Sequence, residues 1–268
     1  MRAVGLDTDG FIEREGALAR VPQAFAPVVD AARAAIRDSF GRDRLHSAYL
    51  YGSVPRGTAV PGVSDLDLLL VLHDEPAPAD RSGADIIQDA LDARFPQIIG
   101  AGIGVVSTAA VLSDLERHDL GWFVACLCTP LIGEDLAARL PRYRPTSLLA
   151  RETNGDLGDS LPGWRDRLDE ASTAASLQAL SRGVARRIVR TGFTLVMPRW
   201  GGWTSELGES TAAFGLYYPE RLEQMRVAAA VAHTPTADLP VLRMLIGDLG
   251  PWLASEYLAV HGPKMARG

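Results

Sequence analysis

The pattern of apolar and polar positions predicts that the first half of the chain mixes strands with helices. Apolar residues recur at helical spacing in two segments, and shorter apolar runs bounded by turn residues separate them. The expected elements are a helix over 22–40, strands over 45–51 and 65–72, a helix over 80–95, a strand over 102–107, a helix over 111–128 and a short strand over 131–136. The strand over 65–72 ends in a continuous apolar run, which is typical of a central strand covered on both faces.

The second half of the chain shows helical spacing only. The expected helices cover 162–171, 174–196, 204–218, 219–231 and 238–261. Residues 141–146, with the sequence PRYRPT, form the best linker, so we expect domains over 1–145 and 146–268. The fold class is α+β: an N-terminal domain with a small mixed sheet and helices, followed by an all-α helical-bundle domain. Residues 1–20 are polar and aperiodic, and we expect a loose arm there.

Composition and charge exclude several classes of protein. The 268 residues carry a formal net charge of −6, which argues against a protein that tracks long nucleic acid. No apolar run reaches the roughly 20 residues that a membrane-spanning helix needs, and the first residues lack the apolar core of a secretory signal. We expect Cys126 and Cys128 to be buried thiols in a reducing compartment, and the protein to be cytoplasmic.

Two carboxylates at the start of the second strand are the strongest candidates for chemistry. Side chains two positions apart on a strand point to the same face, so Asp65 and Asp67 are expected to project together. Leu66, Leu68 and Leu70 would then project into a core on the other face. Neighbouring carboxylates repel each other, and a bound divalent cation relieves that repulsion. Mg²⁺ is the expected cation, because it commonly takes one or two carboxylates together with substrate phosphates.

A glycine–serine turn precedes these acids. Gly52 and Ser53 end the first strand, where backbone N–H groups and a hydroxyl can face an anion. A turn that binds phosphate next to a strand that binds metal provides the parts needed to hold a metal–nucleoside triphosphate.

The order of strand, Gly52-Ser53, loop, Asp65-Leu66-Asp67 and strand resembles the signature of the DNA polymerase β-like nucleotidyltransferase superfamily. With a helical second half, the chain looks most like the streptomycin/spectinomycin (aminoglycoside) adenylyltransferases. The resemblance implies a transferase that moves AMP from Mg-ATP to a hydroxyl of a small molecule such as an aminoglycoside. It also implies that Gly52 and Ser53 hold the triphosphate, that Asp65 and Asp67 bind Mg²⁺, and that Arg56 and Ser64 lie near the phosphates.

The third strand departs from the pattern of this superfamily, in which a third carboxylate stands on the strand beside the two aspartates. Here that strand reads GIGVVS and has no acid. Three interpretations stay open. The acid comes from elsewhere, with Glu152, Asp114 or Glu116 as candidates, and Glu152 is our choice for a catalytic role. The enzyme works without it at a reduced rate. Or the protein is a non-catalytic, regulatory or antitoxin-like nucleotide-binding member.

Basic and aromatic residues of the second half are further candidates. Arg182, Arg186 and Arg190 stand four apart, with Arg187 beside them; they form either a solvated basic face or a cluster that faces an anion. Arg186, Arg190 and Arg199 are the expected triphosphate contacts. Trp200 and Trp203 are expected to belong to the core, with stacking on a ligand as the alternative.

Overall fold

The structure is a computed structural model that describes residues 4–266. Its residues group into two compact units. One comprises Glu13–Tyr143, and the other comprises Met1–Ile12 together with Arg144–Gly268. The expected division into domains 1–145 and 146–268 stays a prediction about independent folding, which a grouping of contacts does not test.

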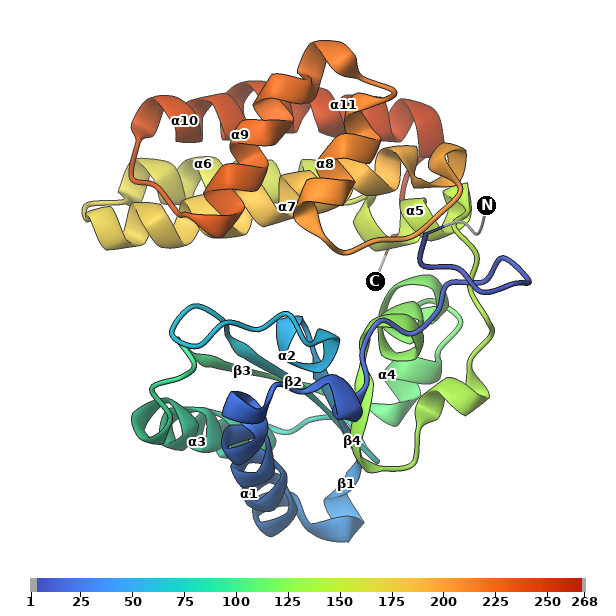
Figure 1. The fold of residues 1–268 in the computed structure, drawn as a ribbon, viewed down its shortest axis with the longest axis vertical. Helices are drawn as coiled ribbons and strands as arrows, with labels where there is room; N and C mark the ends of the chain where they lie inside the picture. The colour runs from blue at the N-terminus through green and yellow to red at the C-terminus, as the bar shows by residue number, and fades with distance from the viewer. Residues whose placement is uncertain (1–3, 267–268) are drawn as a thin grey trace. The chain divides into compact units, whose positions relative to one another are not determined.

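A four-stranded mixed sheet forms the centre of the unit Glu13–Tyr143 (Figure 1). Its strands are β1 (Leu45–Tyr51), β2 (Leu66–Leu72), β3 (Ala101–Ser107) and β4 (Thr129–Gly133), in the spatial order β3-β2-β1-β4. β1 pairs antiparallel with β2 and β4, and β2 pairs parallel with β3. The predicted α+β class and mixed sheet are confirmed.

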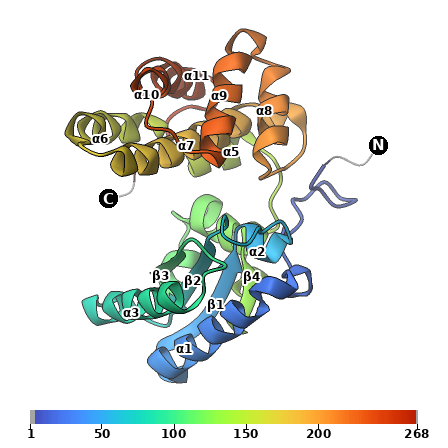
Figure 2. The same ribbon diagram turned by 60° about the vertical axis from the view of Figure 1, so that its left-hand side comes forward.

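Two helices cover one face of this sheet (Figures 1 and 2). They are α1 (Ala26–Arg44) and α3 (Pro78–Arg94). Within α1, Gly41 has φ 62° and ψ 178°, a conformation that nearly only glycine adopts, and it breaks the helix after Phe40. The helix predicted over 22–40 therefore exists, preceded by a 3₁₀ turn over Gln23–Phe25.

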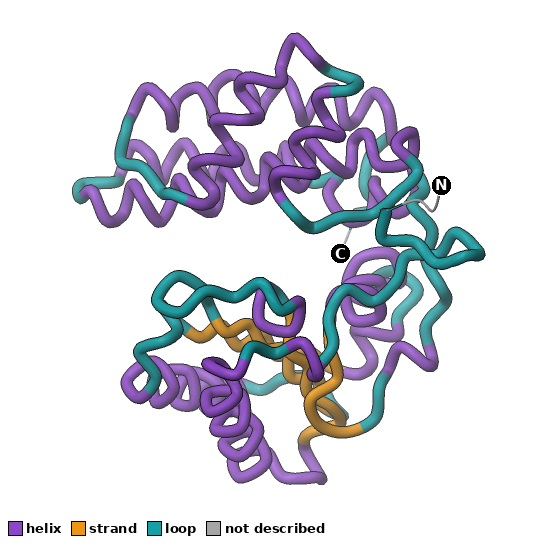
Figure 3. Tube along the Cα trace, in the orientation of Figure 1, coloured by secondary structure: helices purple, strands orange, loops and turns teal. Residues whose placement is uncertain are grey.

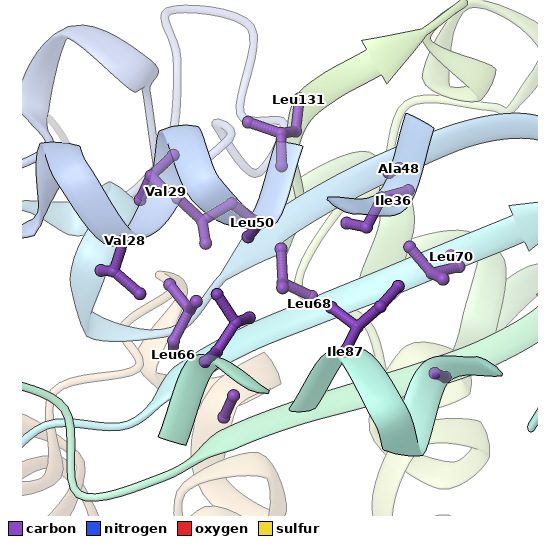
Figure 4. Close-up of a cluster of buried hydrophobic side chains, with 14 of the residues drawn as sticks. Val28, Val29, Ile36, Ala48, Leu50, Leu66, Leu68, Leu70, Ile87 and Leu131 are labelled. Atoms are coloured by element: carbon purple, nitrogen blue, oxygen red, sulfur yellow. The ribbon is translucent and has the colours of Figure 1, made fainter. Parts of the chain in front are cut away.

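The core under α1 and α3 contains the leucines that alternate with the candidate acids. Leu66, Leu68 and Leu70 are fully buried there, as the strand period requires (Figure 4). The opposite face carries Leu69 and Val71, which belong to a second buried cluster. β2 is thus a central strand covered on both faces, as expected.

The predicted helix over 111–128 is broken into shorter pieces. α4 covers only Thr108–Leu112, and two π-helical turns follow at Arg117–Gly121 and Phe123–Leu127. Ser113 ends α4 because its backbone is extended and its hydroxyl bonds locally, donating to the carbonyl of Ala110 and accepting from the N–H of Glu116. The sequence did not predict this break, because apolar residues continue at helical spacing beyond Ser113.

Both cysteines of this unit are buried and free, as expected. Burial raises the pKa of the Cys126 thiol to about 12, and it raises the pKa of the Cys128 thiol well above its usual value. A thiol with a raised pKa is a poor nucleophile at neutral pH. We therefore assign the two cysteines to the core.

Replacing Leu68 with alanine should lower the free energy of unfolding by about 2–5 kcal/mol, because it leaves a cavity in the core beneath α1 and α3. Urea denaturation followed by circular dichroism measures the change. Ile86→Ala on α3 is the matched control, since Ile86 is 69% exposed and its truncation should change stability little. Equal losses from the two substitutions would contradict the assigned strand face.

The unit that contains Arg144–Gly268 has no strand among its described residues outside one isolated bridge, and Figure 3 shows it as a helical assembly. Its helices are α5 (Ser147–Asn154), α6 (Leu157–Glu170), α7 (Ala174–Trp200), α8 (Leu207–Gly215), α9 (Leu222–His233), α10 (Leu239–Met244) and α11 (Gly250–His261). The all-helical prediction is confirmed, although α5 was not predicted. No helix of residues 4–266 is long and apolar enough to cross a membrane.

Helix α7 continues past the point at which the sequence predicts its end. Pro198 lies inside it and offers no N–H to the carbonyl of Thr194. The ring of buried His261 approaches the carbonyls of Thr194 and Leu195, with Nε2 donating to Leu195 at 3.1 Å. His261 thus donates to a carbonyl next to that of Thr194. Arg199 lies on the last turn of the helix and not after it.

The N-terminal residues are better ordered than predicted. Leu6 pairs with Ile12 across a tight turn, and the N–H of Trp203 donates to the carbonyl of Val4 at 2.9 Å. The guanidinium of Arg144 stacks over the ring of Phe11 at 4.0 Å. The expected loose arm is therefore wrong for residues 4–20, and residues 1–3 lie outside the described part of the chain.

Candidate active site

Asp67 lies near the start of the inner strand β2, one position after its first residue. It pairs with Tyr51 at the end of β1 and with Gly102 at the start of β3. Its side chain points away from the core that holds Leu66 and Leu68, and it is half-buried. The register therefore brings Asp67 beside the glycine–serine turn, because Gly52 follows Tyr51 directly.

Gly52 shapes the space around this carboxylate. It has φ 80° and ψ −151°, which L side chains rarely adopt. A Cβ at this position would lie 2.5 Å from Oδ2 of Asp67, closer than such atoms approach. Only glycine therefore lets the turn pass against the carboxylate of Asp67.

The turn continues into the four-residue helix α2 (Ser53–Arg56). The carbonyl of Ser53 accepts a hydrogen bond from the N–H of Thr58 at 3.1 Å, which closes the turn. Gly57 ends α2 in the left-handed conformation, with φ 80°. Successive N–H groups after a positive-φ glycine can face an anion, and among the described residues no side chain caps α2 at its start.

Ser64 and Asp65 belong to the loop that leads into β2. The hydroxyl of Ser64 accepts a hydrogen bond from the N–H of Val60 at 2.9 Å, and its carbonyl accepts one from Ile99 at 3.2 Å. Ser64 thus orders the loop before Asp65, which is half-buried and lies two positions from Asp67. That Asp65 and Asp67 share one metal ion stays a prediction.

The position beside Asp67 on β3 carries no side chain. Gly102 pairs with Asp67, and a Cβ on Gly102 would lie 3.6 Å from Oδ1 of Asp67, an ordinary contact. Gly104 pairs with Leu69, and a Cβ on Gly104 would lie 3.3 Å from Cδ1 of Leu69, a tight contact. Within residues 4–266 no three or more His, Cys, Asp or Glu side chains gather as a metal site. The described chain therefore offers two aspartates, a set that suits Mg²⁺ because this ion keeps several waters and binds substrate phosphates.

The candidates for a third acid have other partners. Asp114 forms an ion pair with Arg117. Glu152 lies on α5 in the helical unit, where it is buried, pairs with the guanidinium of Arg151 at 2.7 Å and accepts from the N–H of Met265 at 3.3 Å. These contacts give Glu152 a structural role in its own unit, and its catalytic role stays a prediction.

The candidate arginines of the helical unit differ in their surroundings. Arg186 is half-buried on α7 and Arg190 is exposed. Arg199 stacks over Tyr217 at 4.6 Å and donates to the hydroxyl of Tyr218 at 3.2 Å. Roles in nucleotide binding stay predictions for Arg186, Arg190 and Arg199.

The tryptophans next to Arg199 pack on the helical core. The rings of Trp200 and Trp203 lie edge to face against Phe193, at centroid distances of 5.5 and 5.6 Å. Trp203 is buried, which agrees with the core interpretation for this residue.

One side chain near the turn was missed by the sequence analysis. Glu15 lies 3.4 Å from Nη1 of Arg56, through Oε2. The two residues are 41 positions apart, and no local pattern around Glu15 points to this contact.

Comparison with known proteins agrees with this geometry. Residues 33–100 match the sequence model of the nucleotidyltransferase domain, a segment that contains Gly52, Ser53, Asp65 and Asp67. No curated protein sequence matches the chain. Among solved structures, the chain is similar to the spectinomycin adenyltransferase AAD(9) from Enterococcus faecialis, determined with ATP and spectinomycin. The TM-score is 0.52 at 12% identity, over 86% of this chain and 98% of that chain.

A likeness at this identity concerns the fold, whereas the domain match concerns the segment that carries the candidate acids. Together they confirm the predicted resemblance, and they support the expectation of an enzyme. Residues 33–100 therefore match a nucleotidyltransferase domain, and the chain resembles the spectinomycin adenyltransferase AAD(9) in fold.

Proposed function

We propose that the protein is a Mg²⁺-dependent enzyme that transfers AMP from ATP to a hydroxyl group of a small molecule such as an aminoglycoside. The observation that carries the proposal is the carboxylate of Asp67 packed against Gly52, with Gly102 beside it. In this arrangement a carboxylate that could bind a metal lies next to a turn whose backbone can face phosphate. The ATP and spectinomycin in the AAD(9) structure support a nucleoside triphosphate and a small acceptor for a chain of this fold.

The proposed roles follow from position. Asp65 and Asp67 would bind Mg²⁺, which supplies positive charge next to the phosphate oxygens. Gly52 and Ser53 would hold the triphosphate, with Arg56 and Ser64 near it. The acceptor hydroxyl would attack the α-phosphorus in line and release pyrophosphate. Catalysis would rest on positioning and on charge, because no covalent intermediate is needed.

The test is incubation with Mg-ATP and a panel of aminocyclitols and aminoglycosides. We expect pyrophosphate release with at least one acceptor, and transfer of label from [α-³²P]ATP to that small molecule. Label on protein or RNA instead would contradict a small acceptor. Absence of release, together with absence of ATP binding by calorimetry, would contradict the proposal as a whole.

A second candidate function is nucleotide binding without transfer. The observation that favours it is Gly102, because the strand position beside Asp67 lacks an acid that could help to deprotonate an acceptor. Tight ATP binding without turnover on any acceptor would support this second function.

Replacing Gly102 with aspartate should lower the Mg²⁺ concentration needed for half-maximal ATP binding by roughly tenfold, because a third carboxylate adds charge where the cation binds. The space exists, since a Cβ on Gly102 makes only an ordinary contact with Asp67. Calorimetric titration with ATP at a series of Mg²⁺ concentrations measures the change. Gly102→Ala is the control for filling the space without adding charge. An unchanged Mg²⁺ requirement in Gly102→Asp would show that Gly102 does not face the metal.

A further inference from the structure

The segment Glu13–Arg20, which we call the strap, packs along the same unit as the candidate site. Arg14 forms two hydrogen bonds to the carboxylate of Asp135, at 2.7 and 3.1 Å, and its Nε donates to the carbonyl of Ala125 at 3.1 Å. The N–H of Glu15 donates to the carbonyl of Cys126 at 2.9 Å. One side of the strap is therefore fixed to the segments just before and just after β4.

The other side of the strap holds the turn after Gly52. The N–H of Ala17 donates to the carbonyl of Pro55 at 2.9 Å, inside α2. The carboxylate of Glu15 lies 3.4 Å from the guanidinium of Arg56, the last residue of α2. The carbonyl of Arg20 approaches Gly57 so closely that a Cβ there would lie at 3.0 Å. Three successive residues of the turn thus contact the strap.

Close packing leaves the strap little freedom to slide. A Cβ on Gly16 would lie 2.4 Å from the hydroxyl of Thr129 and 3.0 Å from Pro55. The side chain of Glu15 is only 15% exposed, and its carbonyl accepts from Nη1 of Arg20 at 2.9 Å. The position of Glu15 is therefore well defined by its surroundings. The side chain of Arg56 is longer and more exposed than that of Glu15.

We propose that the strap is a positioning element for nucleotide binding, and that Glu15 is its key residue because it orients Arg56 and holds the turn Ser53–Gly57. The proposal rests on the proposed function, in which this turn contacts the triphosphate. It assigns a role in that reaction to a segment outside the matched domain, which begins at residue 33.

Two effects of Glu15 on a bound triphosphate oppose each other. Its charge repels the phosphates, so removing it favours binding. Its contact orders the side chain of Arg56 before the nucleotide binds. Without Glu15, that side chain must become ordered during binding, and the loss of entropy weakens the affinity for the nucleotide. We expect the ordering effect to be the larger of the two. The sign of the change in affinity thus separates positioning from simple repulsion.

The experiment compares Glu15→Ala, Glu15→Gln, Arg56→Ala and the double variant Glu15→Ala/Arg56→Ala with the full-length protein. Calorimetry measures the dissociation constant of Mg-ATP, and hydrogen–deuterium exchange measures protection of the turn 53–58. We expect Glu15→Ala to weaken ATP binding about fivefold, within the range of coupled neighbours. Arg56→Ala should weaken it at least as much, and the double variant should be no worse than Arg56→Ala. Glu15→Gln keeps an acceptor for Arg56 and should recover part of the affinity.

The amides of Gly57 and Thr58 donate to carbonyls inside the turn, so they should exchange faster in Glu15→Ala. Asp30→Asn is the matched control, since Asp30 forms a surface ion pair with Arg33 on α1 and its loss should change neither readout. Unchanged or tighter ATP binding in Glu15→Ala would overturn the proposal, whatever the exchange of the turn. If the wild-type protein binds no ATP, the proposed function fails by itself, and faster exchange in Glu15→Ala then still supports a strap that holds the turn.

Discussion

Replacing Asp67 with asparagine should reduce nucleotidyl transfer on the order of 10³-fold, because a neutral amide cannot provide the charge that binds Mg²⁺ beside the phosphates. Asp67 stands between Gly52 and Gly102 near the start of the inner strand β2. Pyrophosphate release at saturating acceptor measures the loss. Asp65→Asn should act in the same direction.

Folding must be separated from chemistry in this comparison. The asparagine has nearly the shape of the aspartate, so the thermal midpoint without nucleotide should change little. Asp30→Asn again serves as the control, because it makes the same chemical change on the surface of α1. ATP binding in Asp67→Asn that still depends on Mg²⁺ as in the wild-type protein would place the metal elsewhere.

Replacing Gly52 with alanine should be almost as damaging, for a geometric reason. The new Cβ would lie 2.5 Å from Oδ2 of Asp67, so the turn or the carboxylate must move. A displacement of about 1 Å at a reacting site can reduce the rate on the order of 100-fold. The positive φ of 80° adds strain of roughly 1–3 kcal/mol to the folded state. We expect both a lower thermal midpoint and a loss of activity of this size.

Gly41→Ala is a close match for this substitution. Gly41 has φ 62° and ψ 178°, so it lies in the same glycine-specific region as Gly52. A Cβ on Gly41 would meet nothing within 4 Å. Gly41→Ala should therefore show the strain alone, as a lower thermal midpoint with normal activity. If the two variants lose activity to the same extent, the contact between Gly52 and Asp67 is not what supports catalysis.

The strands around the site could be predicted because side chains on a strand alternate between two faces, and the apolar residues of this segment follow that alternation clearly. On β2, Asp67 and Leu69 alternate with Leu66, Leu68 and Leu70. Because the face that carries these three leucines is buried, Asp67 must point to the other face of the sheet. The sequence left open whether Gly102 and Gly104 or Ile103 of the third strand face the site, and the structure pairs Gly102 with Asp67. The lack of an acid on this strand was evident from the sequence, because residues 102–107 read GIGVVS.

Other features depend on contacts that a local pattern does not contain. Ser113 ends α4 through its own hydrogen bonds, although the apolar spacing continues beyond it. Pro198 stays inside α7 because His261, far along the chain, approaches carbonyls near the break. The strap was expected to be loose because its order comes from partners such as Asp135 and Pro55.

The most direct test of the account is a crystal structure with Mg²⁺ and a nonhydrolysable ATP analogue. The account predicts Mg²⁺ at roughly 2.0–2.1 Å from carboxylate oxygens of Asp65 and Asp67, with the triphosphate against the turn at Gly52 and Ser53. A nucleotide bound away from this turn, or aspartates that point to opposite faces of β2, would contradict it.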